Sequence, residues 1–336
     1  MRDECFGPLA ATTNRRAFLA AAACVALAPA VTASRAAAAQ ASRKPPEFAF
    51  AKTPEALQLN FGQKPVARYQ IQKPTTGGSP AESACYFHPV ATPAGTVVTE
   101  VGPEDHPHHR GIFLGFVEVK GAAKGDFWGW GEPAPTAGRR IVNQSVEAPP
   151  PALGTARFRA LNEWQIEGQT LIKEDLRAFV GFHDGSTMIE LAIQLSAESE
   201  VTLARWAFGG FAVRLRKDGE LTAFNADGPV TRPAPKHTDP TSNWPDAPWY
   251  GLRLKNPEGK QATVVVASRA SNPATSWHVL PGIGLLNPCI TAPAAVTITP
   301  AKPLVLRYRV LAFDGTPKPE VIQGLAETFY RAGEKS

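Results

Sequence analysis

The sequence predicts an all-β fold, built as an antiparallel sandwich or barrel. Apolar residues alternate with polar ones along short runs, and Gly, Pro, Asn and Asp residues separate the runs. Near the C-terminus, for example, Leu306, Tyr308 and Val310 share one face of an extended chain, while Arg307 and Arg309 share the other. This is the pattern of a half-buried antiparallel strand, and many such strands in series are typical of sandwiches and barrels.

Period-two runs occur along most of the chain. The expected strands lie at residues 66–72, 96–101, 112–119, 155–161, 170–180, 187–195, 211–216, 262–268, 296–299 and 304–313. One helix is expected at residues 319–332, where Ile322, Leu325 and Phe329 fall on one apolar stripe. A single amphipathic helix of this kind is expected to cover a face or an edge of the sheets.

The N-terminus carries the pattern of a twin-arginine (Tat) export signal. Arg15 and Arg16 precede an Ala-rich apolar segment that ends near Val31, too short for a membrane helix of about 20 residues. We expect residues 1–40 to be a Tat-type signal followed by a disordered stretch, and residues 41–336 to form a single β-sandwich domain. The mature protein is then expected to be periplasmic or secreted, with no membrane contact after cleavage.

The charge balance argues against nucleic acid as a partner. The 336 residues carry a net charge of +5, and the basic residues are spread along the chain instead of forming a stripe. A small-molecule partner is expected, and the oligomeric state stays open. Two cysteines follow the signal, Cys85 and Cys289, which either pair in an oxidising compartment or stay as buried thiols.

Residues 102–116 read GPEDHPHHRGIFLGF and concentrate titratable side chains in front of an apolar run. In an extended chain one face would carry Glu104, His106, His108 and Arg110, and the other Asp105 and His109. Imidazoles beside a carboxylate and a guanidinium suit proton transfer near neutral pH. Two imidazoles with a third from elsewhere would also suit a metal ion. A solvated His-rich loop is the alternative without a chemical role.

Two further stretches are candidates for the same site. In Ser276-Trp277-His278-Val279-Leu280, a strand would point His278 away from Trp277; a hydrogen-bonded core histidine is the alternative. Residues 125–131 read GDFWGWG, in which glycines alternate with tryptophans beside Asp126. Such a turn presents flat apolar faces that suit a sugar ring, although a tryptophan corner of the core would look the same.

Residues 226–250 contain six prolines, two tryptophans and His237. A segment of this length without regular structure is usually functional or disordered, and its aromatic residues argue against disorder. We interpret it as a lid or rim loop of the sandwich.

The order of these pieces resembles the DUF6807 family, which is also labelled the PmoA family or methane oxygenase. The residues that carry the resemblance are Tyr86-Phe87-His88-Pro89, Gly102 to Gly111, Asp126-Phe127-Trp128, Asn272-Pro273, Trp277-His278 and Asn287-Pro288. The oxygenase label suits this sequence poorly, because a membrane oxygenase subunit needs several apolar spans and none follows the signal. Gly111 stands at a position that the family often fills with Ser.

The resemblance implies a large antiparallel β-sandwich, a supersandwich akin to galactose-mutarotase-like proteins, with a C-terminal helix. It also implies a setting of carbohydrate breakdown. The positions that match the family pattern and would carry a role are His106, His108, His109, Arg110, Asp126, Trp128 and His278.

These observations together predict a periplasmic enzyme that acts on a sugar or keto-sugar glycoside by elimination, hydrolysis or mutarotation. The expected catalytic residues are His106, His108, His109, Arg110 and His278, with Arg110 stabilising developing negative charge. The expected substrate-binding residues are Glu104, Asp105, Asp126, Trp128, Asn272 and Asn287. No cofactor is expected. The alternatives are a non-catalytic carbohydrate-binding protein and an enzyme that holds a divalent metal on His106, His108 and His278.

Overall fold

The computed structural model describes residues 47–74, 84–152, 154–256 and 259–332. The expected export signal lies outside the described residues. In the described part of the chain the strands form sheets of eight, nine and four strands, with antiparallel pairing throughout. The predicted all-β class and the C-terminal helix are therefore confirmed. No helix in these ranges is long and apolar enough to cross a membrane.

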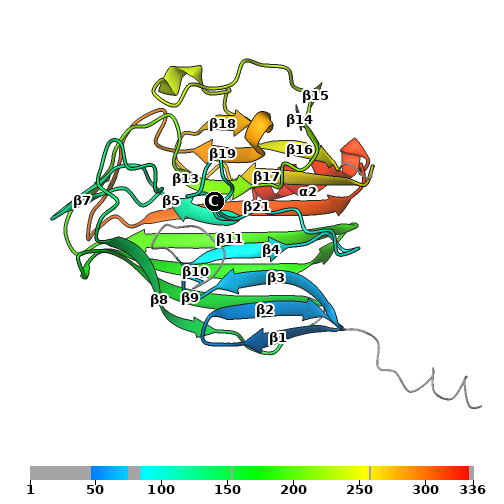
Figure 1. Cartoon of the computed structure of the whole chain (residues 1–336), viewed down its shortest axis with the longest axis horizontal. Helices are drawn as coiled ribbons and strands as arrows, with labels where there is room; N and C mark the ends of the chain where they lie inside the picture. Colours follow the sequence, from blue (N-terminus) through cyan, green and yellow to red (C-terminus); the bar gives the residue numbers. More distant parts are fainter. Residues whose placement is uncertain (1–46, 75–83, 153, 257–258, 333–336) are drawn as a thin grey trace, which may run out of the picture. The chain divides into compact units, whose positions relative to one another are not determined.

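The eight-stranded sheet is the first of the two large layers. Figure 1 shows its strands in the order β1 (Phe48–Lys52), β2 (Ala56–Phe61), β3 (Lys64–Gln70), β4 (Tyr86–Val90), β5 (Ile112–Gly115), β13 (Gly210–Arg214), β19 (Leu285–Cys289) and β18 (Ser276–Leu280). The strands that carry the late Trp-His pair thus lie beside those that follow the early histidines, because β13 joins β5 to β19.

The nine-stranded sheet is the second large layer. Its order is β15 (Gly228–Pro229), β14 (Glu220–Asn225), β16 (Trp249–Lys255), β17 (Gln261–Ser268), β21 (Leu304–Asp314), β11 (Ser186–Ser196), β10 (Gln169–His183), β9 (Thr155–Ile166) and β8 (Arg139–Glu147). The small sheet contains β20 (Val296–Ile298), β12 (Val201–Leu203), β6 (Val119–Lys120) and β7 (Lys124–Gly125). Two short 3-10 helices are η1 (Pro240–Ser242) and η2 (Pro281–Ile283).

The core lies between the two large sheets. Phe211 of β13 stacks on Tyr308 of β21 with ring centroids 4.2 Å apart, and Tyr69 of β3 packs 5.1 Å from Phe158 of β9. These contacts join the layers face to face, as in an aligned β-sandwich. The alternating apolar residues of both sheets are buried here, which explains why the period-two runs predict the strands correctly.

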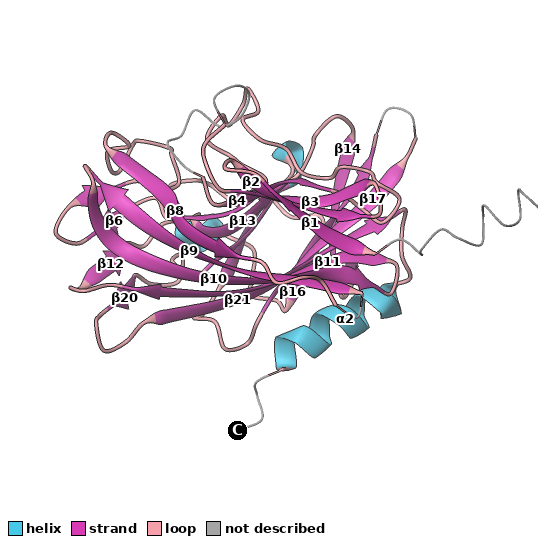
Figure 2. Cartoon of the chain, turned by 90° about the horizontal axis from the view of Figure 1, so that it is seen from below, coloured by secondary structure: helices cyan, strands magenta, loops and turns pink. Residues whose placement is uncertain are grey.

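Helix α2 (Pro319–Arg331) covers part of the outer face of the nine-stranded sheet (Figure 2). Its buried residues Ile322, Leu325 and Phe329 share one cluster with outward residues of the sheet such as Val265 and Leu311. The predicted stripe therefore packs as expected. It explains why β17 and the last part of β21, Val310 to Phe313, are apolar on both faces.

The structure corrects several predicted strands. Residues 96–101 make only isolated bridges, since Val97, Thr99 and Val101 each pair with a different partner segment. Residues 112–119 divide into β5 and β6, which belong to different sheets. The strands that were not predicted include β1, β2, β8, β14 and β16.

Candidate active site

The candidate site lies on the outer face of the eight-stranded sheet, where β5, β13, β19 and β18 run side by side (Figure 1). Phe113, Ala212 and Leu285 point outward from this part of the sheet and form a small apolar cluster separate from the main core. Residues of segments 102–110, 125–131 and 230–247 complete the site above it.

The histidine segment is not extended as predicted. His106 N–H donates to Pro103 O at 3.1 Å, and His109 N–H donates to His106 O at 2.9 Å, so the chain makes two tight turns. The predicted separation of side chains onto two faces is therefore wrong. The rings converge instead: His106 stacks on His109 with centroids 4.8 Å apart, and His108 lies 4.7 Å from His109.

The three histidines share one pocket with His278. Its lining residues are His106, His108, His109, Trp128, Trp130, Phe208, His237, His278, Leu280, Ile283 and Leu285. The His237 ring stands 6.5 Å from that of His106 and 5.5 Å from that of His278, which links the early and late imidazoles. The free volume is about 30 Å³, enough for a water molecule but not for a sugar ring.

His278 is held in one orientation by Asn243. The Asn243 amide nitrogen donates to Ala207 O at 2.6 Å and to Ser276 Oγ at 3.2 Å, which turns its oxygen toward the ring. His278 Nδ1–H then donates to Asn243 Oδ1 at 2.8 Å, so Nε2 carries the lone pair. This Nε2 atom is buried and has no hydrogen-bond partner. Burial, with His237 nearby, lowers the pKa of His278 to about 3.

His109 is neutral and fixed from below by Arg214. The Arg214 guanidinium donates to His109 Nδ1 at 3.3 Å, which leaves the ring proton on Nε2. Arg214 also donates to Asp105 at 2.9 Å, and Lys217 pairs with the same carboxylate at 3.0 Å. Burial alone would raise the pKa of Asp105, but Lys217, Arg214 and His106 outweigh it and lower the pKa to about 2. Asp105 therefore acts as an anchor for the segment and does not line the pocket.

His106 and His108 are also neutral at pH 7. Burial, then the neighbouring His106, lowers the pKa of His108 to about 3. Burial lowers the pKa of His106 as well, although Asp105 Oδ2 lies 3.4 Å from His106 Nδ1 and acts in the opposite direction. His106, His108, His109 and His278 therefore present uncharged imidazoles, each with one donor and one acceptor nitrogen.

Arg110 was predicted to stabilise charge in the site, and the structure places it elsewhere. Its side chain is fully buried and does not line the pocket. It donates to the backbone oxygens of His108 at 3.1 Å, Trp128 at 3.1 Å and Phe127 at 3.0 Å. Arg110 thus joins the histidine turn to the Gly/Trp loop. Burial lowers its pKa to about 9, so it stays charged at pH 7.

Asp126 has a structural role in the same loop. Its carboxylate accepts hydrogen bonds from the backbone N–H groups of Trp128, Gly129 and Gly131 at 2.6–2.8 Å. These bonds shape the turn that presents Trp128 and Trp130 to the pocket. Trp128 thus lines the pocket beside the histidines, and Asp126 supports it without reaching the pocket.

The other predicted binding residues lie outside the pocket. Asn287 is buried and bonds to the backbone of Gly209 and Phe211, where it fixes β13 against β19. Asn272 bonds to the backbone N–H and oxygen of Arg307, on the other sheet. Glu104 is exposed on the turn and is not a lining residue. Proline has no backbone N–H group, so the side chain of an Asn beside it can supply the hydrogen bond that the backbone lacks.

Sequence reasoning missed His237, Asn243, Trp130 and Phe208 as site residues. His237 and Asn243 belong to the Pro-rich segment interpreted as a lid. The composition of that segment is the signal that could have identified them. Trp244 exchanges backbone hydrogen bonds of 2.9 Å with Trp277, which brings the segment onto β18. Phe208 had no comparable signal, because a single aromatic residue before a strand is usually a core residue.

Within the described ranges, no group of three or more His, Cys, Asp and Glu residues is placed so that it could hold one metal ion. His106, His108 and His278 therefore do not form the ligand set of the metal alternative. Cys85 and Cys289 are both free thiols.

A family model described as a family of unknown function, DUF6807, matches residues 56–327. The chain belongs to the DUF6807 family. No curated protein matches the sequence.

Similar solved structures include an α-galactosidase from Lactobacillus brevis, with 11% identity over 80% of this chain and a TM-score of 0.39. The GH36 α-galactosidase AgaB from Geobacillus stearothermophilus has 10% identity over 80% of this chain, also with a TM-score of 0.39. The DUF6807 chain spans only 39% and 41% of these two proteins. A galactose mutarotase related enzyme from Lactobacillus acidophilus is covered over 99% of its length, with 6% identity over 81% of this chain and a TM-score of 0.36. Likenesses this weak say nothing about the reaction.

Proposed function

We propose that this DUF6807 protein is an exported carbohydrate-processing enzyme that acts on a sugar or keto-sugar glycoside by imidazole acid–base chemistry. One observation carries the proposal. His278 is oriented by Asn243 so that its unpartnered Nε2 lone pair lies in a pocket of neutral imidazoles and aromatic rings. A buried acceptor without a partner is costly to a fold, so a ligand donor at this point would relieve the cost.

Each group in the pocket has a role in this chemistry. His278 Nε2 accepts a proton from the substrate, and the N–H groups of His108 and His109 donate to the oxygen that gains negative charge. Trp128, Trp130 and Phe208 offer apolar faces for the C–H surface of the ring. The imidazoles thus take the part that was expected of Arg110.

Burial lowers the pKa of His278 to about 3, so its Nε2 is unprotonated at pH 7 and free to accept a proton. Elimination from a keto-sugar glycoside is the reaction that we place first. A neutral imidazole can take the C–H proton beside the carbonyl while a neighbouring imidazole N–H stabilises the enolate oxygen, and the enolate then expels the glycosidic oxygen.

The substrate cannot enter the pocket as it stands. With about 30 Å³ free, the segment that carries His237 and Asn243 must move before a sugar ring reaches His278. Opening would also break the bond that orients His278, so the base would be set only when the segment closes over the substrate.

The first test is a screen of the purified protein against oxidised and unoxidised glycosides, read by NMR to separate hydrolysis, elimination and anomer exchange. On any substrate found, we expect His278→Gln to lower kcat at least ~100-fold, because general-base catalysis contributes about that much. His183→Gln is the matched control, since His183 is exposed in the β10–β11 turn. Full turnover by His278→Gln would contradict the proposed role of His278 in an enzyme. Unchanged sugar binding with no turnover by the wild type would favour the carbohydrate-binding alternative, which the aromatic walls also suit.

Asn243 is a positioning residue, and its variants test the orientation of His278. Asn243→Asp places a carboxylate beside Nδ1–H, which stabilises the imidazolium and raises the pKa of His278. We expect the acidic limb of the pH–rate profile to move to higher pH in Asn243→Asp. Asn243→Ala should lower kcat without this displacement. A purely structural role for Asn243 would give both variants the wild-type profile.

A further inference from the structure

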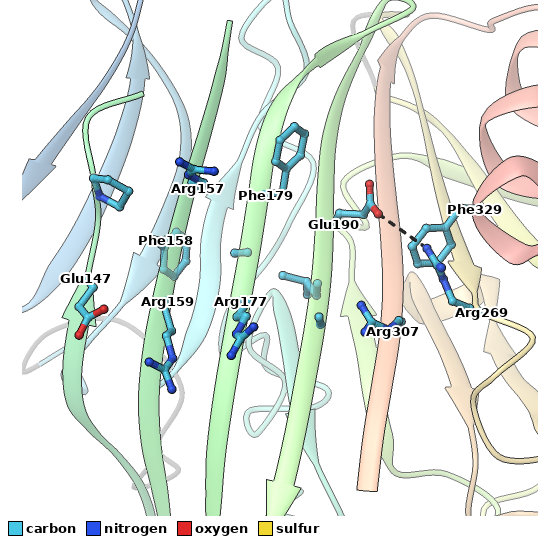
Figure 3. Close-up of a pocket in the computed structure, with 14 residues that line it drawn as sticks. Glu147, Arg157, Phe158, Arg159, Arg177, Phe179, Glu190, Arg269, Arg307 and Phe329 are labelled. Atoms are coloured by element: carbon cyan, nitrogen blue, oxygen red, sulfur yellow. Dashed lines mark ion pairs between the residues drawn. The ribbon is translucent and has the colours of Figure 1, made fainter. Parts of the chain in front are cut away.

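A second cavity lies on the opposite side of the sandwich, on the outer face of the nine-stranded sheet beside α2. It has a volume of about 540 Å³, and Figure 3 shows its side chains on strands β8, β9, β10, β11 and β21. We call it the arginine groove, because its walls carry Arg157, Arg159, Arg177, Arg269 and Arg307. Only two acidic residues line it, Glu147 and Glu190, so the groove is positively charged.

Strand register brings the arginines into rows. Arg159 of β9 pairs with Arg177 of β10, and Arg177 pairs with Ala192 of β11. Ala192 in turn pairs with Arg307 of β21. Since neighbouring strands lie about 4.8 Å apart, this row extends for about 14 Å across the sheet. Ala192 leaves an opening in it, and the next row carries Arg157, Phe179 and Glu190.

The positive charges of the groove are only partly compensated. Asp175 pairs with Arg159 at 2.9 Å and with Arg177 at 3.3 Å. Within the part of the chain that the structure describes, the exposed side chains of Arg157 and Arg307 have no acidic partner. Arg159 and Arg177 lie opposite each other and share Asp175, so the guanidinium groups of Arg157 and Arg307 are the ones left to pair with an anion.

We propose that the arginine groove binds an acidic oligosaccharide, a short chain of sugars that carry carboxylates. A guanidinium matches a carboxylate with two parallel hydrogen bonds. The half-buried Phe179 offers an apolar face for sugar C–H surfaces (Figure 3). The volume is within the usual range of ligand sites, about 300–1,000 Å³.

The two lining carboxylates favour a glycan over a nucleic acid. Glu147 and Glu190 can accept hydrogen bonds from the hydroxyl groups of a glycan, which phosphodiester groups do not carry, and Glu190 does so beside Arg309, with which it pairs at 2.8 Å. Glu190 lies 4.0 Å from Arg269, and the Arg269 guanidinium lies 4.5 Å from the centroid of the Phe329 ring. Acceptors and cations therefore alternate along the groove, beside the half-buried ring of Phe179. This assignment rests on a different site from the proposed reaction and does not depend on it.

Calorimetric titration of the purified protein with trigalacturonate, and with uncharged maltotriose, tests the proposal. We expect saturable binding of trigalacturonate only, weaker at higher salt because exposed ion pairs are screened. The double variant Arg177→Gln/Arg307→Gln should bind at least tenfold more weakly. Arg140→Gln, an exposed arginine of β8 outside the groove, should bind like the wild type.

Circular dichroism of each variant shows whether it is folded. His278→Gln should bind trigalacturonate like the wild type, because His278 lies in the other site. Absence of trigalacturonate binding would overturn the proposal. Equal binding of maltotriose, or unchanged binding by a folded double variant, would do the same. Polyuridylate binding as tight as trigalacturonate binding would also overturn it, because the groove would then be a general polyanion surface.

Discussion

At the scale of single residues, side chains outside the pocket determine which nitrogen of each imidazole carries the proton. Asn243 holds the Nδ1 of His278 and Arg214 holds the Nδ1 of His109, so each ring has a defined tautomer. Both rings are buried. Neutral buried imidazoles also make the stability of the fold depend on pH.

We expect the protein to lose stability as the pH falls from 6.5 toward 3. The pKa of His278 is lowered from 6.5 to about 3 in the folded chain. In this window the unfolded chain binds a proton that the folded chain does not, so the free energy of unfolding decreases as the pH is lowered. His278→Gln should show a flatter dependence, measured by urea unfolding between pH 7.5 and 4.5. His183→Gln should follow the wild type, and parallel curves for all three proteins would contradict the assignment.

At the scale of elements, loops position the side chains of the site, and the eight-stranded sheet lies beneath them. The Gly/Trp loop rests on the histidine turn at Gly129, whose φ is +112°. A Cβ atom at Gly129 would lie 2.8 Å from the Cβ of His108, closer than side chains approach. Glycine is required there both for the backbone conformation and for the contact.

Gly129→Ala should therefore displace His108 and lower activity on any substrate of the pocket. Gly131→Ala is the matched control, because Gly131 also has a positive φ of 88° but its nearest atom would be 3.7 Å away. Both variants carry the backbone strain, so the difference between them reports the contact with His108. It is measured by kcat and by the imidazole signals in NMR. Equal effects of the two substitutions would show that the contact does not matter.

At the scale of the whole molecule, one core joins the two large sheets. Leu114 of β5 and Leu306 of β21 belong to the same buried cluster, although they lie in different layers. Residues 46–336 also form one compact unit by their contacts. A core shared in this way is expected to unfold in a single cooperative step.

Leu114→Ala and Leu306→Ala should each destabilise that single transition by roughly 2–5 kcal/mol, the usual effect of deleting a buried leucine side chain. Val305→Ala, next to Leu306 but 42% exposed, should change stability by less than about 0.5 kcal/mol. Urea unfolding followed by tryptophan fluorescence and by circular dichroism measures both quantities. Two separate transitions would contradict a shared core.

The sequence also indicated the positions of the groups that form the site, but not which of them face it. Three histidines in four residues and a late Trp-His pair were visible as a pattern, and the structure places them around one pocket. Arg110 and Asp126 carry the same functional groups as catalytic residues. The structure directs Arg110 to the backbone oxygens of Phe127 and Trp128, and Asp126 to backbone N–H groups of its own turn, so neither side chain lines the pocket. No periodicity records such bonds.

The sequence by itself determined the all-β class, the long strands β9, β10, β11, β17 and β21, and the terminal helix, because period-two and period-3.6 patterns follow from local backbone geometry. The resemblance to DUF6807 was likewise readable from short motifs. Only the tertiary structure decided that the histidine segment turns, that Asn243 orients His278, and that arginines of β9, β10 and β21 form a groove. These features depend on strand order and register, which join residues far apart in the chain, and no local pattern encodes them.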